Sequence, residues 1–292
     1  MKNISKTFLI WTVILILYGF NSKAAKLSIR AFDANQVLFA ESKSKPLDLK
    51  GVINLTIDRE YQEGDYLIVE GAKNLFVQFD KNIPGCYVYV PKGSFKFRIP
   101  FHENGKNYQV ESFSGTKHQI KARICGKKEW STYRNLALNS FDIRGGTDYY
   151  PHATSNSECR NESFYAARNA IDGYKSSSKH GKWPYQAWGP DMRDDLWFKI
   201  DFGKAVEVDK LVIFNRAQYY DLHDSYWKEA FVIFSDGSSE KIRIEKTALP
   251  QEIKMSKHNT SWVKFTDLKE NEKKWCSWIE MEIWGRDLTY DK

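Results

Sequence analysis

Short runs of alternating apolar and polar residues, separated by turn residues, constrain this sequence most strongly. Each run is rich in β-branched or aromatic residues, which is the pattern of a half-buried strand. In the first half the runs are 65–70, 75–80, 86–90, 94–99 and 118–124, and the turn residues between them include Gly71, Pro84-Gly85, Lys92-Gly93 and Asn104-Gly105. No helical pattern of useful length precedes Gly126. Short strands at this spacing predict an antiparallel sandwich or barrel.

The second half repeats the pattern after a polar connection at 126–133. Its expected strands are 196–202, 210–214, 230–234, 241–245, 261–265 and 278–284, with a hairpin turn at 235–238. A short helical turn is expected at 163–171, because Ser163 can cap it and Gly173 follows it. A long loop rich in Ser, Lys and aromatic residues spans 174–195. We therefore predict an all-β protein with two jelly-roll-like β-sandwich domains, at residues 26–126 and 135–287.

The N-terminal segment has the organisation of a secretory signal peptide. Lys2 and Lys6 precede an apolar run of 13 residues, Phe8–Phe20, and small residues follow it up to Ala24. The run is shorter than the roughly 20 residues that a membrane-spanning helix needs. We predict that residues 1–24 are a cleaved signal peptide and that the mature chain has no transmembrane span, with an uncleaved anchor as the alternative. The protein is then secreted, periplasmic or at the cell surface.

The charge of the chain does not indicate a nucleic-acid partner. Its formal net charge is +7, and without the three lysines of residues 1–24 a total of 41 basic and 37 acidic residues leaves +4. No block of Lys and Arg residues strengthens the case for nucleic acid.

Four cysteines follow the expected signal peptide, and an even number in an exported chain indicates disulfide bonds. They are Cys86, Cys125, Cys159 and Cys276. Three pairings are possible, and the order along the chain favours Cys86 with Cys125 and Cys159 with Cys276. A zinc site formed by four cysteines is the alternative, but the chain has no C-x₂-C pair.

Asp172 and Glu280 form a candidate calcium site. Asp172 and Gly173 end the expected helical turn, where backbone carbonyls lack intrahelical partners, and Glu280 lies in the last expected strand. Carboxylate and carbonyl oxygens are the ligands that Ca²⁺ takes in proteins. An Asp-Gly pair after a helix can equally be a simple cap, so the spacing leaves both interpretations open.

The loop at 180–189 concentrates what a sugar needs, namely flat aromatic rings with hydrogen-bonding groups beside them. It contains His180, Trp183, Tyr185 and Trp188. We take His180 and Trp183 as candidate ligand-binding residues. The alternative is that Trp183 and Trp188 fold back and fill the end of the sandwich.

A second candidate segment follows the expected strand 210–214. Arg216, His223, Asp224 and Trp227 can together bind sugar hydroxyls or a carboxylated sugar. In the alternative interpretation, Arg216 and Asp224 form an ordinary ion pair and Trp227 begins the next strand as a core residue.

Signatures of common enzymes are missing from the sequence. There is no G-x-S-x-G, H-E-x-x-H, Walker loop or G-x-G-x-x-G motif. Asp194 and Asp195 are adjacent, so on a strand they point to opposite faces, which is poor geometry for a two-carboxylate glycosidase. The six histidines show no metal-ligand spacing.

The motifs of the second half occur in an order that resembles a known family. They are NLALN at 135–139, ATSN at 153–156, AIDG at 170–173, WG at 188–189, LWFKIDFG at 196–203, FSDG at 234–237 and IEMEIWG at 279–285. This set resembles the galactose-binding-like β-sandwich of discoidin (coagulation factor C-type) domains and family-32-like carbohydrate-binding modules. The first half resembles a bacterial jelly-roll companion domain more loosely.

The resemblance implies a ligand site on loops at one end of the sandwich, often made of His, Arg and an aromatic residue. It also implies a structural calcium ion near the Asp-Gly turn and a Glu of the last strand, which here are Asp172 and Glu280. The sequence departs from the common family pattern in its long, Trp-rich loop at 174–195.

We therefore expect an exported, non-catalytic carbohydrate-binding protein whose partner is a glycan or polysaccharide, with a larger cell-surface or glycan-degrading assembly as a further partner. The main alternative is a polysaccharide lyase or glycoside hydrolase with a site in residues 26–126 or at the domain junction. A third hypothesis is an adhesion module for protein or phospholipid. That module needs exposed apolar loop tips, whereas these loops are polar and aromatic.

Overall fold

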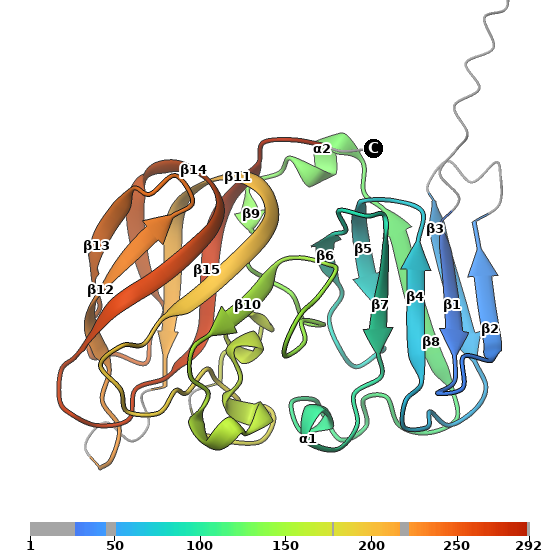
Figure 1. The fold of residues 1–292 in the computed structure, drawn as a ribbon, viewed down its shortest axis with the longest axis horizontal. Helices are drawn as coiled ribbons and strands as arrows, with labels where there is room; N and C mark the ends of the chain where they lie inside the picture. The colour runs from blue at the N-terminus through green and yellow to red at the C-terminus, as the bar shows by residue number, and fades with distance from the viewer. Residues whose placement is uncertain (1–26, 45–50, 177, 217–221, 291–292) are drawn as a thin grey trace, which may run out of the picture.

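The structure is a computed structural model that describes residues 27–44, 51–176, 178–216 and 222–290. It contains two β-rich bodies that lie side by side along the long axis (Figure 1). The expected signal peptide lies outside the described residues. Within the described ranges, no helix is both long enough and apolar enough to cross a membrane.

The N-terminal body is a sandwich of two four-stranded antiparallel sheets. One sheet has the order β2-β1-β4-β7, and the other has the order β3-β8-β5-β6. The strands are β1 Ser28–Phe32, β2 Leu38–Lys43, β3 Val52–Ile57, β4 Tyr66–Glu70, β5 Asn74–Gln78, β6 Cys86–Tyr89, β7 Ser94–Arg98 and β8 His118–Ile124. The five runs expected in this half are therefore confirmed as strands, and β1 to β3 are strands that the sequence analysis did not predict.

The N-terminal core extends beyond the strands of its own sandwich. Its buried side chains meet between the two sheets, as the alternation of exposed and buried residues along β3 requires. Phe141 and Tyr149, which follow the connection, also pack into this core, with ring centroids 4.9 Å from Phe79 and 4.5 Å from Phe95 respectively. The segment that leads into the second body is thus held by the first.

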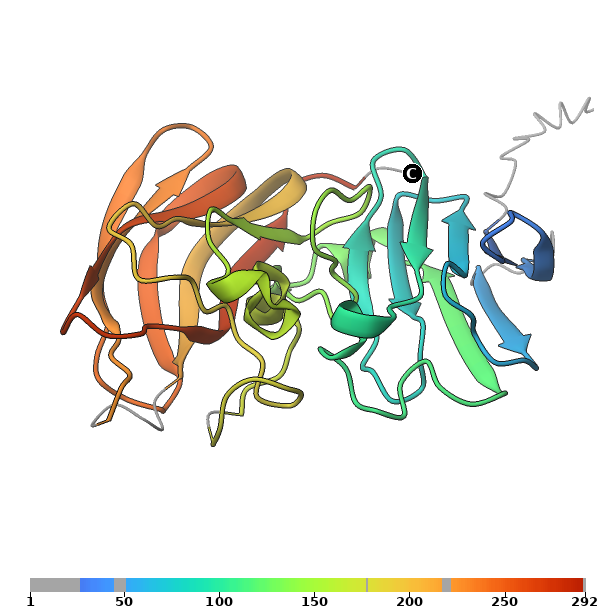
Figure 2. The same ribbon diagram turned by 60° about the horizontal axis from the view of Figure 1, so that its bottom comes forward.

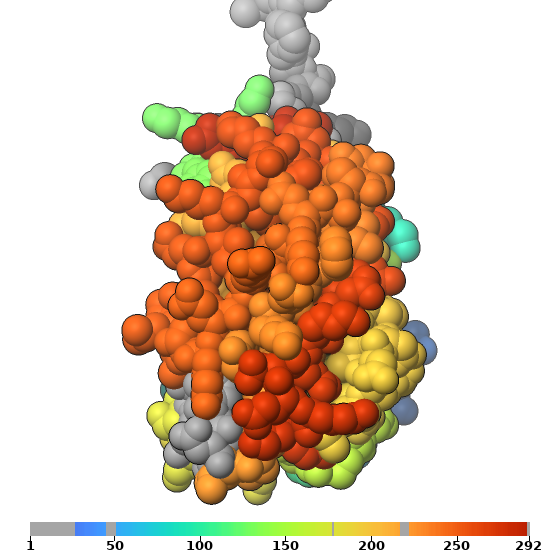
Figure 3. Space-filling view, turned by 90° about the vertical axis from the view of Figure 1, so that its left-hand side faces the viewer, coloured from blue at the N-terminus to red at the C-terminus, as the bar shows by residue number. Residues whose placement is uncertain are grey.

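The C-terminal body is a seven-stranded antiparallel sheet that curves around its core. The order is β13-β12-β14-β11-β15-β9, and β10 pairs with β11. The strands are β9 Arg134–Asn135, β10 His152–Ser155, β11 Phe198–Asn215, β12 Trp227–Phe234, β13 Ser239–Arg243, β14 Gln251–Glu270 and β15 Trp278–Asp287. Figure 3 shows the side formed largely by β12 to β14.

Two of these strands, β11 and β14, are much longer than the runs expected from the sequence. β11 joins the runs expected at 196–202 and 210–214 into one strand, because its pairing with β14 shifts register between Asp201 and Val206 and the chain bends there without ending the ladder.

The hairpin expected at 235–238 is present, with Gly237 at φ 85°.

Short helical turns connect the strands. The expected helical turn at 163–171 forms as two 3-10 turns, η2 Ser163–Tyr165 and η3 Ala167–Ile171, preceded by η1 Cys159–Asn161. Two single-turn helices, α1 His102–Gly105 and α2 Lys127–Trp130, lie in the first half. Figure 1 shows α1 and the 3-10 turns at the same, lower end of the molecule.

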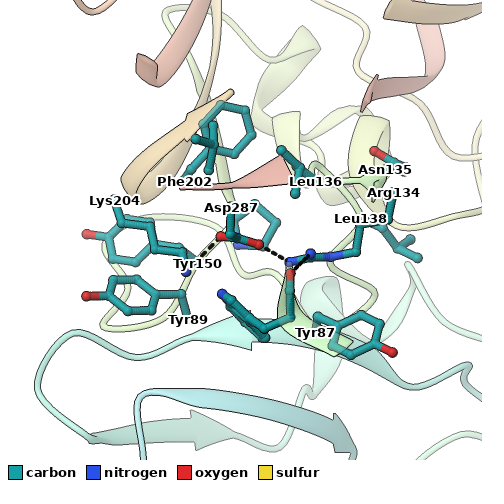
Figure 4. A pocket seen from close by; sticks show the side chains of 13 residues that line it. Tyr87, Tyr89, Arg134, Asn135, Leu136, Leu138, Tyr150, Phe202, Lys204 and Asp287 are labelled. Carbon is teal, nitrogen blue, oxygen red and sulfur yellow. Dashed lines mark hydrogen bonds and ion pairs between the residues drawn. The ribbon is translucent and has the colours of Figure 1, made fainter. Parts of the chain in front are cut away.

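Charged side chains buried against aromatic rings join the two bodies (Figure 4). Lys204 Nζ lies 2.7 Å from Asp287 Oδ1, and Arg134 Nη2 lies 2.5 Å from Asp287 Oδ2. The Lys204 ammonium also lies 4.5 Å from the ring centroid of Trp130 and 4.8 Å from that of Tyr89. The ion pairs themselves lie on the C-terminal side, and the contact between the Lys204 ammonium and the Tyr89 ring reaches the N-terminal body.

The disulfide bonds expected from the sequence are absent, and all four cysteines are buried free thiols. Cys86 pairs with Val77 of β5, and the Cys125 N–H donates to Asn74 O on the other side of that strand. Two strand spacings separate them, about 9–10 Å, and a disulfide needs Cα atoms within about 7 Å. Burial raises the pKa of both thiols to about 12.

The second expected pair, Cys159 with Cys276, is also unformed. Cys159 lines a cleft at the end of the C-terminal body, whereas Cys276 packs in its core, with Sγ 3.7 Å from Lys274 O. The two side chains thus occupy different environments, which the order of the cysteines along the chain does not show.

Candidate functional site

A cleft opens at one end of the C-terminal body, where the loops between its strands converge. It has a volume of about 160 Å³, and its lining includes Arg160, Tyr165, His180, Arg216, His223 and Trp275. Three of these residues, His180, Arg216 and His223, were predicted from the sequence as ligand-binding residues. The structure brings them together from segments that lie before and after β11.

Backbone pairing between neighbouring loops places the cleft residues. Arg216 follows β11, and its N–H donates to Ser277 O over 3.1 Å. The next loop is attached to the same segment, because Asp224 forms a bridge with Trp275 and the Ser225 N–H donates to Trp275 O over 2.7 Å. Trp275 and Arg216 therefore sit on a common backbone framework at the start of β15.

Asp224 orients two side chains of the cleft, those of Arg216 and His223. Its Oδ1 lies 2.6 Å from Arg216 Nη2 and 2.8 Å from His223 Nδ1. The Asp224 side chain is only 1% exposed and does not line the cleft, while the His223 side chain is 50% exposed. Asp224 thus positions Arg216 and His223, which line the cleft.

His180 completes one wall of the cleft. Its Nδ1 lies 3.3 Å from the Tyr165 hydroxyl, and its ring centroid lies 5.9 Å from that of His223. Burial lowers the pKa of His180, and the positive charge of Arg216 lowers it further. The imidazole is therefore neutral at pH 7 and can both donate and accept a hydrogen bond.

Three cleft residues were missed by the sequence analysis. Trp275 and Arg160 were given no role in the sequence analysis, and Tyr165 lies in the helical turn expected at 163–171, which was interpreted only as structure. The Arg160 guanidinium lies 5.7 Å from the Tyr165 ring centroid. All three residues lie in segments that flank the ends of strands. This position in the sequence is the one feature they share, and it does not distinguish them from ordinary loop residues.

Gly189 forms part of the floor of the cleft. A Cβ at this position would lie 2.9 Å from Tyr165 Cδ1 and 3.1 Å from Ser277 Oγ. A larger residue would therefore displace Tyr165 from the wall.

Two of the predicted ligand residues lie elsewhere. Trp227 is 1% exposed and stacks on Trp188 with ring centroids 5.2 Å apart, so it is a core residue and leaves no surface for a ligand. Trp188 fills the core, as the alternative interpretation held. Trp183 does not line the cleft: its ring centroid lies 5.6 Å from that of Tyr174, and its backbone N–H donates to Lys106 O of the N-terminal body over 3.5 Å.

Asp172 and Glu280 meet in the interior, as the calcium hypothesis requires. Asp172 accepts hydrogen bonds from the Tyr174 N–H and the Gln186 side-chain amide, at 2.9 and 3.0 Å. Glu280 Oε2 accepts one from the Gly173 N–H over 3.2 Å. Burial raises the pKa of both carboxyl groups, and the charge of Asp172 raises that of Glu280 further.

The chemistry of this acidic pair fits an oxygen-bound cation. Glu280 Oε1 is buried and has no hydrogen-bond partner among the described residues. Arg168 lies 3.6 Å from Asp172 and supplies one positive charge for the two carboxylates. In the described ranges no three His, Cys, Asp or Glu residues cluster as metal ligands, so backbone oxygens would have to complete the coordination.

The fold and the cleft define a β-sandwich module with a polar, aromatic-lined site at its loop end. Residues 152–281 match the family model described as the F5/8 type C domain. The C-terminal body is therefore a domain of this discoidin-type, galactose-binding-like family. The resemblance found in the sequence is thereby confirmed.

Solved structures that are similar to this chain include several sugar-binding modules. Chitosan-binding module 1 of a chitosanase/glucanase from Paenibacillus sp. IK-5 has 18% identity and a TM-score of 0.37, covering 52% of this chain and 99% of that chain. A fucose-binding module of Streptococcus pneumoniae has 18% identity and a TM-score of 0.39, covering 54% and 99%. A family 32 module from C. perfringens in complex with galactose has 16% identity and a TM-score of 0.35, covering 45% and 91%. No curated protein matches the chain.

Proposed function

We propose that the C-terminal domain binds a glycan in the cleft between His180, Arg216, His223 and Trp275, without chemical conversion. One observation carries the proposal: the buried Asp224 holds the Arg216 guanidinium and the His223 imidazole in fixed positions next to an aromatic side chain. Such preorganised donors lower the entropic cost of ordering the site when a ligand binds.

The cleft offers complementary groups to a sugar ring. Arg216 can donate hydrogen bonds to hydroxyl oxygens, and His223 and neutral His180 can each pair with a hydroxyl group. The Trp275 ring can cover the apolar C–H face of the sugar. A neutral or weakly acidic sugar therefore suits this cleft better than an apolar or cationic ligand.

The absence of carboxylates from the cleft lining favours binding over hydrolysis. No Asp or Glu lines the cleft among the described residues. The nearby Asp224 is buried, and its Oδ1 is engaged by Arg216 and His223. A glycosidase needs two carboxyl groups that flank the scissile bond, so this cleft lacks the groups for that reaction.

The same proposal includes a structural role for calcium and an exported location. Asp172 and Glu280 would hold Ca²⁺ away from the sugar, and the ion would neutralise two buried carboxylates and stiffen the turn at Gly173. The signal-peptide pattern of residues 1–24 supports export to the cell surface, the periplasm or the medium.

A glycan array on the chain without residues 1–24, with and without EDTA, tests the proposal. Galactose, fucose and chitotriose are included as soluble probes for calorimetry. We expect Arg216→Ala and Trp275→Ala to abolish or strongly weaken binding of any glycan that scores. Trp262→Ala is the matched control, since Trp262 is a half-buried tryptophan of β14 outside the cleft. Unchanged binding by both cleft variants would rule out this site.

A further inference from the structure

A second and larger pocket lies where the N-terminal body meets the segment that leads into the C-terminal domain. Its volume is about 440 Å³, within the range of pockets that bind small ligands. Arg98 ends β7, Phe101 precedes α1, and Asn107 and Tyr108 follow α1, while the C-terminal side supplies Arg144 and Arg168. Figure 2 shows α1 facing the 3-10 turns across this junction.

The interior of this pocket, which we call the junction pocket, combines apolar surface with an unsatisfied polar group. Phe101 is half-buried, and Tyr108 is buried under the Arg168 guanidinium at 5.0 Å. Asn107 is 1% exposed, and its Oδ1 has no hydrogen-bond partner in the described part of the chain. Buried acceptors are rarely left unpaired in proteins, so this oxygen points to a ligand that donates a hydrogen bond.

Most polar side chains at the rim of the junction pocket are paired with a neighbour. His102 pairs with Glu63 at 3.1 Å, and Lys106 pairs with Glu103. Arg98 is exposed and forms no ion pair with any described residue. The rim thus offers one guanidinium donor within a balanced charge distribution, which suits a ligand rich in hydroxyl groups.

Groups that could do acid–base chemistry in the junction pocket are already committed. Asp142 Oδ1 lies 2.7 Å from His152 Nδ1, and its Oδ2 accepts the Ala153 N–H over 2.9 Å. Burial raises the pKa of Tyr108, so its hydroxyl stays protonated. The pocket is therefore better equipped to bind a sugar than to cleave it.

One short turn separates the junction pocket from the cleft. Arg160 of η1 lines the cleft, and Arg144 lines the junction pocket. Arg144 is fastened to the same turn, with Nε 2.8 Å from Glu158 Oε2 and Nη1 3.2 Å from Asn161 O. Arg144 of the junction pocket and Arg160 of the cleft are therefore both held at η1.

From this arrangement we propose that the junction pocket is a second subsite for the same glycan chain, so that the chain spans both bodies of the protein. The inference rests on the proposed glycan-binding function of the cleft. It assigns the N-terminal body a share in ligand binding, through Arg98, Phe101 and Asn107. The preferred ligand is then an oligosaccharide or polysaccharide and not a single terminal sugar.

The test is calorimetry with galacto-, fuco- and chito-oligosaccharides of one to six units, on the chain without residues 1–24. In the series that binds, the six-unit sugar is expected to bind at least about tenfold more tightly than the one-unit sugar, because it engages two linked subsites. The double variant Arg98→Ala/Phe101→Ala should reduce six-unit affinity to the one-unit value and leave one-unit affinity unchanged. Lys96→Ala, an exposed change on the same strand outside the pocket, should alter neither.

Hydrogen exchange provides a readout that does not depend on affinity. The six-unit sugar should slow exchange at backbone amides of residues 101–108, and the one-unit sugar should not. The inference is overturned if the double variant binds the six-unit sugar like the unmodified chain, or if these amides gain no protection. If the proposed glycan binding in the cleft were wrong, the result would differ: Arg216→Ala would leave the affinity for the one-unit sugar unchanged.

Discussion

The buried ion pair between Arg216 and Asp224 allows the stability and the binding function of the cleft to be separated by experiment. The side chains are 6% and 1% exposed, and their closest atoms are 2.6 Å apart. Removal of one partner leaves a buried charge without compensation, which costs about 3–5 kcal/mol of unfolding free energy. We expect this loss for Arg216→Met and for Asp224→Asn.

The double variant Arg216→Met/Asp224→Asn should be much less destabilised than the sum of the two. It removes both charges, and replacing both partners of a buried pair is often nearly neutral in stability. We expect a total loss of no more than about 3 kcal/mol, against about 6–10 kcal/mol if the two effects were additive. Glycan binding should be lost in all three variants, because each lacks the Arg216 guanidinium, the Asp224 carboxylate that orients it together with His223, or both.

Urea unfolding followed by tryptophan fluorescence is a suitable assay. Eight of the ten tryptophans lie between Trp183 and Trp284, so the signal reports on the C-terminal domain. Calorimetry on the same samples measures binding. Single-variant losses below about 1 kcal/mol, or losses that simply add in the double variant, would refute the argument that the pair is buried and mutually dependent.

Four further predictions follow from the site and its surroundings. Trp275→Ala should weaken glycan binding about 5- to 30-fold, the equivalent of 1–2 kcal/mol of lost ring contact, with an unchanged midpoint of urea unfolding. The pKa of His180 is lowered, so its neutral form prevails above pH 6.5. The stability of the domain and its affinity for glycan should therefore both fall as the pH drops below 6.5. A glycan affinity that stays constant down to pH 5 would contradict this. Calcium at 100 times its Kd should stabilise the domain by about 2.7 kcal/mol in thermal unfolding. Glu280→Gln should remove this effect, so that the variant has the same melting temperature with and without EDTA. Alkylation of the unfolded chain without reductant should label four cysteines, and fewer than four labels would indicate a disulfide.

The strands were predictable because their signal is local. Alternation with period two depends on which face of one strand is buried, and that information lies within five to seven neighbouring residues. The ordered motifs of 135–287 also lie at strand and turn positions, which explains why they identified the F5/8 type C fold. β1 and β2 were missed because this local signal is weak in them: they are short strands that carry charged residues.

The cysteines illustrate information that is not local. Their even number and order suggested two bridges, but whether two side chains meet depends on strand order and register. β5 lies between Cys86 and Cys125, and Cys276 points into the core while Cys159 faces the cleft. Neither relation can be inferred from the spacing of the residues along the chain.

The sequence alone thus determined that the chain forms two all-β bodies, that the second resembles the discoidin-type family, and that His180, Arg216 and His223 are candidate ligand residues. Tertiary structure decided which aromatic side chain joins them, since Trp227 faces the core and Trp275 faces the cleft although both flank strands. It also created the junction pocket, whose two walls come from different bodies. The physical reason is that exposure and proximity are properties of the packed chain: a local pattern predicts the conformation of a segment but not the surface against which it packs.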